Sequence, residues 1–302
     1  MDGHGAGVAQ DSLQFGPSHI IEPQSEHTHT AIVLHGRGSL ADEFASDFLV
    51  ESTLSDGCNL RDKLPGWRWV FPSSKELWST VFQEHMPAWF EAHSLTDPTA
   101  RQDLQVGGLL ESVNHISRII EEEIERLGGG GGGSHKRLVL GGISQGGAVA
   151  MWTLLSRRRG GSKNESGGLG AFFAADTWLP FAADVNDLLA SHHNEEVPPH
   201  VPGSTEQPKD AILAMIPPFV VDAPAPASLG VHEQTTPVFL GHGTDDAYVD
   251  VELGRQAAHV LAQGGWTVEW KEYAGAEEEG HWFKVPDEIN DIFTFLVRVA
   301  ST

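Results

Sequence analysis

The stretch that most constrains the fold is "LVLGGISQGGAVA", which runs from Leu138 to Ala150. Branched apolar residues are followed by Ser144 between two pairs of glycines, and then by small residues that favour a helix. A short branched run is typical of a buried strand. A loop that needed only flexibility would not require a strand before it and a helix after it. The stretch therefore predicts a sharp strand-to-helix turn that presents Ser144.

The spacing of Gly142, Ser144 and Gly146 fits the pattern G-x-S-x-G. In such a turn the positions two before and two after the serine are crowded, so that only very small side chains fit. The helix that follows directs free amides and the positive end of its dipole at the serine. The glycines around Ser144 fit neither G-x-G-x-x-G nor the phosphate-binding P-loop pattern. Ser144 is therefore a candidate nucleophile, and a plain glycine-rich turn remains the alternative for this motif alone.

Strands and helices are predicted to alternate along the chain. A stripe of Leu, Val and Ile at spacings of three and four predicts a helix over 109–127. A second helix should follow Gly147, and a last one should begin near Pro286, whose fixed φ suits a first turn. Alternation of this kind favours an α/β fold with a mainly parallel central sheet and helices on both faces. Short apolar runs predict strands at Ala31–Leu34, Arg68–Phe71, Leu138–Leu140, Ala171–Ala175, Val238–Leu240 and Thr267–Lys271.

With 302 residues, 40% of them hydrophobic, the chain is expected to form a single α/β domain over 1–302, with an N-terminal extension over 1–28. The glycine-rich stretch 128–134 is expected to be a slack connection. A proline-rich insertion from about 184 to 236 is too long for an ordinary loop and is either a disordered excursion or a lid. Its stretch "AILAMIPPFVV" favours packing of some part of it.

Composition limits the partners. A net charge of -23 argues against nucleic acid and against steady docking on anionic lipid. No apolar run is long enough for a membrane-spanning helix, and the N-terminus does not have the pattern of a signal peptide. The single cysteine, Cys58, excludes an internal disulfide and favours a reducing compartment. We therefore expect a cytoplasmic protein, and the sequence leaves its oligomeric state open.

A serine nucleophile needs a base, and after this kind of turn the partners follow in the order serine, acid, histidine. The segment "PVFLGHGTDD" ends a strand in a glycine-rich turn that carries Asp245 and Asp246, at the edge where a parallel sheet presents its site. Beyond it only His259 and His281 remain. His259 lies in a predicted helix, whereas His281 lies in a predicted loop. We therefore expect His281 to act as the base on Ser144 and Asp246 to orient it.

Backbone amides are expected to stabilise a developing oxyanion. One is the amide of Gln145, and the other lies near Arg37 in "AIVLHGRGS", where Gly36 and Gly38 let the chain approach closely. His35 is more simply explained as a residue that shapes this loop than as a base. The histidines in "HTH" at 27–29 and the pair at 192–193 lack a credible set of further ligands, so no metal is predicted.

Taken in order, "LHGRG", "AWFEAHSL", "LGGISQGGAVA", "WLP", "GHGTDD" and "GHWF" resemble the acyl-protein thioesterase branch of the phospholipase/carboxylesterase family of α/β-hydrolases. The resemblance spans most of 31–296 outside the proline-rich insertion. It implies the α/β-hydrolase fold and hydrolysis of acyl esters or thioesters, without a metal or organic cofactor. The partner it implies is an acyl ester or thioester substrate, which in some relatives is an S-acylated protein.

Carried over position by position, the family's nucleophile falls on Ser144, its acid on Asp246 and its base on His281. Its oxyanion amides fall on Arg37 and Gln145. The intact set of catalytic residues disfavours the rival hypothesis, a catalytically silent α/β-hydrolase that binds a ligand or a protein.

Substrate contacts are expected from Trp89, Phe90, Trp178 and Leu179, although Trp89 and Phe90 could equally belong to the core. Two positions depart from the family pattern. Glu91 stands where many relatives have aspartate in "WFD", and Asp250 stands where many have proline.

Overall fold

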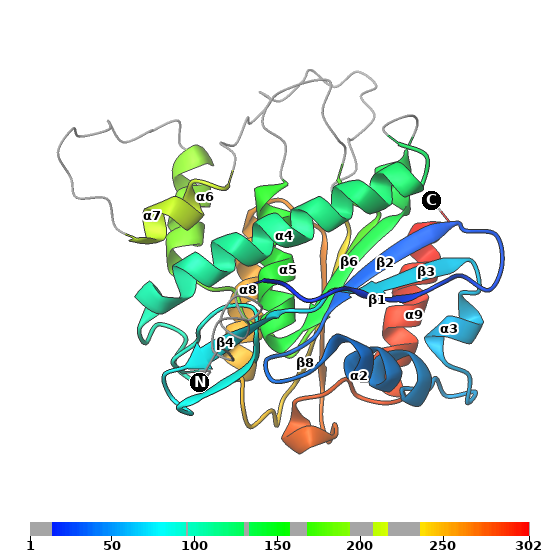
Figure 1. Cartoon of the computed structure of the whole chain (residues 1–302), viewed down its shortest axis with the longest axis horizontal. Coiled ribbons are helices and arrows are strands. Elements are labelled where there is room, and N and C mark those ends of the chain that lie inside the picture. Colours follow the sequence, from blue (N-terminus) through cyan, green and yellow to red (C-terminus); the bar gives the residue numbers. More distant parts are fainter. Residues whose placement is uncertain are drawn as a thin grey trace, which may run out of the picture.

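The centre of the molecule is a seven-stranded sheet with the order β1-β3-β2-β6-β7-β8-β9. All neighbouring strands are parallel except β1, which pairs antiparallel with β3 at one edge (Figure 1). The strands are β1 (His19–Ile21), β2 (His29–Leu34), β3 (Trp67–Phe71), β6 (Leu138–Ile143), β7 (Ala171–Ala175), β8 (Val238–Gly243) and β9 (Val268–Tyr273). The structure, a computed structural model, describes residues 14–94, 96–129, 133–157, 168–193, 208–216 and 236–301.

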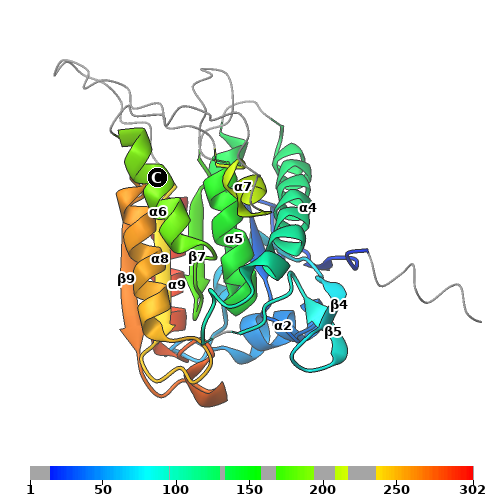
Figure 2. The same ribbon diagram turned by 90° about the vertical axis from the view of Figure 1, so that its left-hand side faces the viewer.

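Helices cover both faces of this sheet (Figure 2). The buried apolar residues form two clusters, one on each face. One face is covered by α4 (Gln105–Arg126), α5 (Ser144–Ser156), α6 (Ala182–His193) and α8 (Val251–Gln263). The other face is covered by α2 (Ala41–Ser46), α3 (Leu60–Lys63) and α9 (Asp287–Ala300). This arrangement confirms the predicted α/β fold.

Smaller elements surround this frame. A two-stranded antiparallel hairpin is formed by β4 (Lys75–Ser79) and β5 (Glu84–Ala88), and the sequence patterns did not predict it. A short helix, α7, spans Pro208–Leu213. The single-turn segments are η1 (Asp47–Glu51), η2 (Gln102–Leu104), η3 (Ser134–Arg137) and η4 (Glu278–Gly280).

The predicted strands are all present, and most of them run a few residues further than expected. The prediction that a helix follows Gly147 is wrong by one turn, because α5 begins at Ser144 itself. The glycines of its first turn are what permit this. A side chain on Gly147 would lie within 2.8 Å of Thr177, so only glycine lets the helix begin this close to its neighbours.

Parts of the proline-rich insertion are folded. Its first residues continue α6, which ends at His193. In and just after α7, Ile212 and Ile216 are buried, as the apolar stretch there predicted. The rest of the insertion, 194–207 and 217–235, lies outside the described residues, as do 130–132 of the glycine run. The prediction of a lid therefore remains a prediction.

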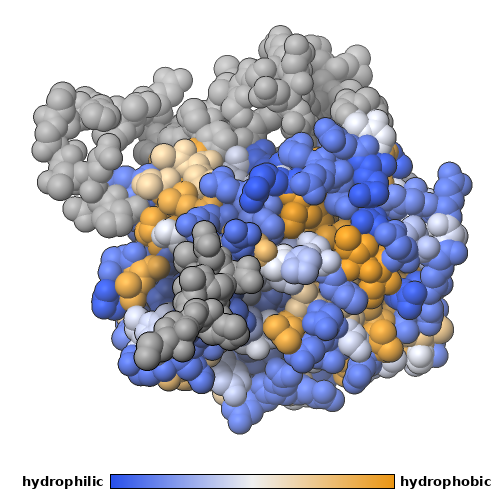
Figure 3. Space-filling model, in the orientation of Figure 1, coloured by the Kyte–Doolittle hydropathy of each residue, from blue (hydrophilic) through white to orange (hydrophobic). Residues whose placement is uncertain are grey.

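The surface is largely hydrophilic on the face shown in Figure 3, with hydrophobic patches between the polar regions. Ile20 on the edge strand β1 is one of the large apolar side chains that remain exposed. None of the helices in the described part of the chain has both the length and the apolar character needed to span a bilayer.

Candidate active site

The turn between β6 and α5 places Ser144 in a strained backbone conformation. Its φ of 53° lies in the left-handed region, which is costly for a residue with a side chain. A Cβ on Gly142 would lie 2.8 Å from the backbone of Gly146. A Cβ on Gly146 would lie under 3.0 Å from the carbonyl oxygens of Leu34 and His35 in and after β2. The crowding predicted from the glycine spacing is therefore present.

Ser144, His281 and Asp246 form one hydrogen-bonded chain. The Ser144 hydroxyl lies 2.9 Å from His281 Nε2, and His281 Nδ1 lies 2.7 Å from Asp246 Oδ2. An ionised carboxylate can only accept, so Nδ1 carries the proton and Nε2 is left to accept from the serine. The three residues come from three separate turns, after β6, after β8 and after β9.

Asp246 is held in its ionised form. Its Oδ1 accepts hydrogen bonds from the backbone amides of Tyr248 at 2.8 Å and Val249 at 3.0 Å. Burial alone would raise the pKa of Asp246, but the His242 ring, whose Nε2 lies 3.4 Å from Oδ2, and the hydrogen bond from His281 outweigh burial and lower that pKa below its ordinary value. A fixed negative charge therefore lies against Nδ1 of His281.

The two alternatives that the sequence offered lie elsewhere. Asp245 accepts a hydrogen bond from the backbone amide of Gly275, and His259 is exposed on α8. The structure brings neither of them to the hydroxyl of Ser144.

The loop after β2 passes directly against the serine, since a Cβ on Gly36 would lie 3.4 Å from Ser144 Cβ. His35 controls the orientation of this loop. Its Nδ1 donates to the Gly36 carbonyl at 2.8 Å, and its Nε2 accepts from the amide of Ser74 at 3.2 Å. Burial lowers the pKa of His35 to about 4, so the ring is neutral at pH 7. Because the C=O and N–H of a trans peptide point in opposite directions, fixing the Gly36 carbonyl also fixes the Arg37 amide.

Gln145 ties the serine turn to the segment after β5. Its amide oxygen accepts from the Trp89 backbone at 2.9 Å, and its amide nitrogen donates to the Phe90 carbonyl at 2.8 Å. The Trp89 indole in turn donates to the His35 carbonyl at 2.8 Å. As a first-turn residue of α5, Gln145 has a backbone N–H without a helical acceptor.

The four expected substrate contacts are all buried in one core cluster, the one that packs under α4 and α5. The Phe90 and Trp178 rings meet edge to face, with centroids 6.2 Å apart. Leu179, the most exposed of the four, is only 4% exposed. The structure therefore brings these residues together, and their substrate role remains a prediction.

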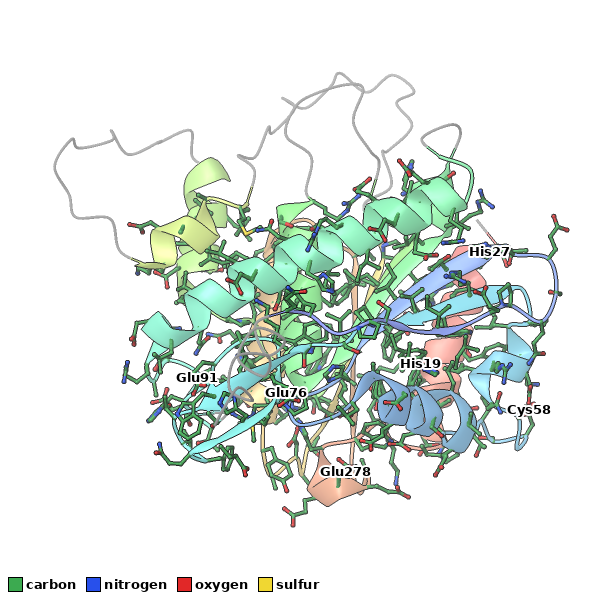
Figure 4. The ribbon with its side chains drawn as sticks, viewed as in Figure 1. His19, His27, Cys58, Glu76, Glu91 and Glu278 are labelled. Atoms are coloured by element: carbon green, nitrogen blue, oxygen red, sulfur yellow. The ribbon has the colours of Figure 1, made fainter. Side chains whose placement is uncertain are left out.

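The two departures from the family pattern have structural partners. Glu91, on the hairpin side of the molecule in Figure 4, accepts hydrogen bonds from the Thr80 backbone at 3.1 Å and the Thr80 hydroxyl at 2.9 Å. It therefore ties the segment after β5 to the tip of the hairpin. Asp250 caps α8, where its side chain accepts from the amide of Glu252 at 2.9 Å.

Sequence reasoning missed two buried residues beside the site, Asp176 and His242. With Asp246 they form a group whose potential ligand atoms lie within 4.8 Å of one another. Hydrogen bonds already occupy much of this group. Both oxygens of Asp246 accept bonds, and His242 Nε2 donates to the Val249 carbonyl at 2.9 Å. A cation at this point would have to displace them.

The histidines considered earlier as metal ligands show ordinary contacts where they are described. His27 hydrogen-bonds Thr30, and His29 hydrogen-bonds Thr28. The side chains of 192–193 lie outside the described part of the chain.

A mostly parallel sheet with a strained serine at the end of a central strand defines the class of α/β-hydrolases. The sequence profile of the phospholipase/carboxylesterase family matches residues 16–198. The chain belongs to this family, as its motifs predicted. The predicted enzyme class, a hydrolase of the esterase and thioesterase type, is confirmed with it.

Named relatives and solved structures agree with this assignment. The chain is 26% identical to acyl-protein thioesterase 1 of Gibberella zeae over 287 residues, which cover 92% of this chain and 93% of that protein. The fold resembles that of Zea mays acyl-protein thioesterase 2, with 20% identity, a TM-score of 0.62 and coverage of 94% and 99% of the two chains. It also resembles Arabidopsis thaliana SOBER1, with 22% identity, a TM-score of 0.60 and coverage of 90% and 98%.

Proposed function

We propose that this protein cleaves acyl esters or thioesters through a covalent acyl-enzyme, with Ser144 as the nucleophile. The observation that carries the proposal is the continuous hydrogen-bonded chain from the Ser144 hydroxyl through His281 to Asp246. A nucleophile, a base and a group that orients the base are the components this chemistry requires.

In the proposed reaction Ser144 Oγ attacks the acyl carbon while His281 Nε2 takes its proton. The negative charge that develops on the acyl oxygen is stabilised by the backbone amides of Arg37 and Gln145, each of which contributes about 3 kcal/mol in comparable sites. His281 then gives the proton to the departing thiol or alcohol, and the acyl group stays bound to Ser144 as the acyl-enzyme. Water, deprotonated by the same ring, releases the acid and restores Ser144.

We propose S-acylated proteins as substrates, because two of the named relatives are acyl-protein thioesterases. We propose that Trp89, Phe90, Trp178 and Leu179 contact the acyl chain. Because all four are buried, part of this cluster has to open for a chain to enter. Rates measured on acyl thioesters of increasing length test this directly. A kcat/KM that is independent of chain length contradicts a role for these apolar side chains.

A fluorophosphonate probe, which reacts with activated serines, tests the proposed nucleophile. Wild type should be labelled, Ser144→Ala should not, and Ser301→Ala, an exposed serine at the C-terminus, should label like wild type. A wild type that resists labelling and hydrolyses neither esters nor thioesters favours the rival function, a silent α/β-hydrolase that binds a ligand or a protein.

A further inference from the structure

A second buried carboxyl group lies beside the acid of the proposed catalytic chain. Asp176 follows β7 and is fully buried. Its Oδ1 accepts a hydrogen bond of 2.8 Å from the amide of Gly243, at the start of the turn that leads to Asp246. Its carboxyl group lies within 4.8 Å of potential ligand atoms of Asp246 and His242. Asp176 therefore contacts the turn that carries the acid, but not the reacting groups themselves.

Two carboxyl oxygens in this region have no partner among the described groups, Asp176 Oδ2 and Glu288 Oε1. Glu288 lies in the first turn of α9, where its Oε2 accepts from the amide of Lys284 at 2.9 Å. Its carboxyl group fills the space that a Cβ on Gly241 would need, and the Gly241 carbonyl accepts from the Asp176 amide at 3.1 Å. Asp176, which follows β7, and Glu288, which lies in α9, therefore both contact the stretch of β8 at Gly241.

The pKa values of Asp176 and Glu288 are shifted in the opposite direction to the pKa of Asp246. Burial raises the pKa of Asp176 well above its ordinary value, and the neighbouring charge of Glu288 raises it further. Burial likewise raises the pKa of Glu288 to about 8. Asp246 is shifted in the opposite direction by its hydrogen bonds. Carboxylates this close do not all ionise together, and the one with the most donors keeps the charge.

We propose that Asp176 is a positioning residue of the hydrolase and that it works as a neutral carboxylic acid. Its Oδ1 holds the turn that carries Asp246, and a proton on Oδ2 turns this unpaired acceptor into a donor, with Glu288 as a neighbouring acid. The role rests on the proposed function, because it acts through Asp246.

The proton matters because an ionised Asp176 would place a second anion next to Asp246. The groups that face Asp176 are Glu288 from α9, His242 from β8 and Asp246 from the turn after it. Of these, only His242 could offset the new charge. Burial lowers the pKa of His242 but Asp246 and Asp176 raise it overall, and a single imidazolium can balance only one of the two carboxylates. Loss of the proton should therefore push the turn away from His281 and lower kcat.

Substituting asparagine at Asp176 and at Asp246 distinguishes an aspartate that acts as a neutral acid from one that acts as a charged carboxylate. Asparagine matches protonated aspartic acid in shape, and its amide can still accept from Gly243 and donate to Glu288. Asp176→Asn should keep kcat/KM at pH 7 within about threefold of wild type, whereas Asp246→Asn should lower kcat by on the order of 10⁴. Asp176→Ala, which has neither bond, should lower kcat about 10-fold or more with little change in KM, so that asparagine rescues what alanine loses.

The pH profile adds a measurement that a merely structural role would not change. In wild type, kcat should fall at a pH well above the ordinary range of an aspartate, where Asp176 loses its proton, because burial raises the pKa of Asp176. That fall should weaken or move to higher pH in Asp176→Asn. Carbon-13 NMR of labelled aspartate in wild type should also show one protonated aspartic acid at pH 7, a measurement that does not depend on the folding of any variant.

Three results would overturn the proposal. The first is an active wild type together with a folded Asp176→Asn variant that is as inactive as Asp246→Asn. That result would show that Asp176 acts as a charged carboxylate and not as a neutral acid. The second is an Asp176→Ala variant with the kinetics and pH profile of wild type, which would contradict the positioning role. The third is an Asp176 carboxyl group that is ionised at pH 7, which would contradict the proposed protonation. A wild type without hydrolase activity or probe labelling is a different failure, because it overturns the proposed function and this role together.

Discussion

Gly146 shows how strictly a single residue can determine the geometry of the candidate site. The carbonyl oxygens of Leu34 and His35 occupy the space that its Cβ would need, and these are backbone atoms that cannot turn away. Gly146→Ala should therefore displace the serine turn. We expect kcat/KM to fall at least 100-fold and the free energy of unfolding to fall by about 1–3 kcal/mol. Ester hydrolysis and urea denaturation measure the two effects.

Gly107 provides the matched control. It is exposed on α4, and a Cβ there would contact nothing within 4 Å. Gly107→Ala should raise the free energy of unfolding by up to about 1 kcal/mol, since alanine is the better helix former, and should leave the kinetics unchanged. Equal kinetic losses in the two variants would contradict the steric explanation for Gly146.

His35 allows a second test at the residue scale. Without its ring the Gly36 carbonyl loses its donor, and the Arg37 amide is free to turn away from the serine. His35→Ala should lower kcat by about 10²–10³ and change KM little, as expected when an interaction made in the transition state is lost. His259→Ala, at an exposed position on α8, should behave as wild type. A loss confined to KM would argue against the oxyanion role of this loop.

The sequence predicted that Ser144, Asp246 and His281 come together, because chain order and strand ends restrict the choice severely, and the structure places the three side chains in one hydrogen-bonded chain. The sequence could not reveal Glu288. An acid in the first turn of a helix usually faces water, where it complements the helix dipole. Only the packing of α9 against Gly241 shows that this carboxyl is buried. Asp176 escaped notice for a similar reason, since nothing in the chain around it distinguishes a buried acid from an exposed one.

At the scale of elements, α4 is anchored to the sheet by a buried ion pair. Glu123 on α4 accepts from Arg68 Nε of β3 at 3.0 Å and from the Thr30 hydroxyl of β2 at 3.3 Å. Glu123→Ala leaves the Thr30 hydroxyl without its acceptor and leaves Arg68 with Glu22 as its remaining carboxylate partner. We therefore expect the free energy of unfolding to fall by about 1–3 kcal/mol. Glu122→Ala, one residue earlier and exposed, should change it by less than about 0.5 kcal/mol, and similar effects of the two would contradict the anchoring.

The elements that sequence patterns located best are those with the strongest periodicity. The stripe over 109–127 lies in α4 except for its last residue, which caps the helix, and the buried strands are all present. The hairpin of β4 and β5 was missed because its strands carry charged residues and Pro87, which weaken the usual pattern of a strand. The start of α5 was predicted after Gly147, too late in the sequence, because helix propensity alone disfavours glycine and cannot show that packing allows glycines in the first turn.

At the scale of the whole molecule, buried neutral acids should make stability depend on pH. Glu288 has a pKa raised to about 8 in the folded state, against an ordinary value of 4.5. The folded state therefore binds more protons than the unfolded state between these two values, so stability is lost as the pH rises from about 4.5 to about 8. This loss should be on the order of 4 kcal/mol.

Urea denaturation at several pH values measures this effect. Glu288→Gln should flatten the decline because glutamine does not ionise, whereas Asp287→Asn, at the exposed neighbouring position, should retain it. A wild type whose stability does not change between pH 5 and 8 would contradict a neutral Glu288.

The distances along the chain between the proposed catalytic groups have a practical consequence. Ser144 and His281 are 137 positions apart, and the turn that carries Asp246 reaches them only when β8 and β9 are paired with the rest of the sheet. Probe labelling of the serine is therefore a sensor of complete folding. During refolding it should appear together with the last strands to dock, which makes it possible to time assembly of the C-terminal half without any added fluorophore.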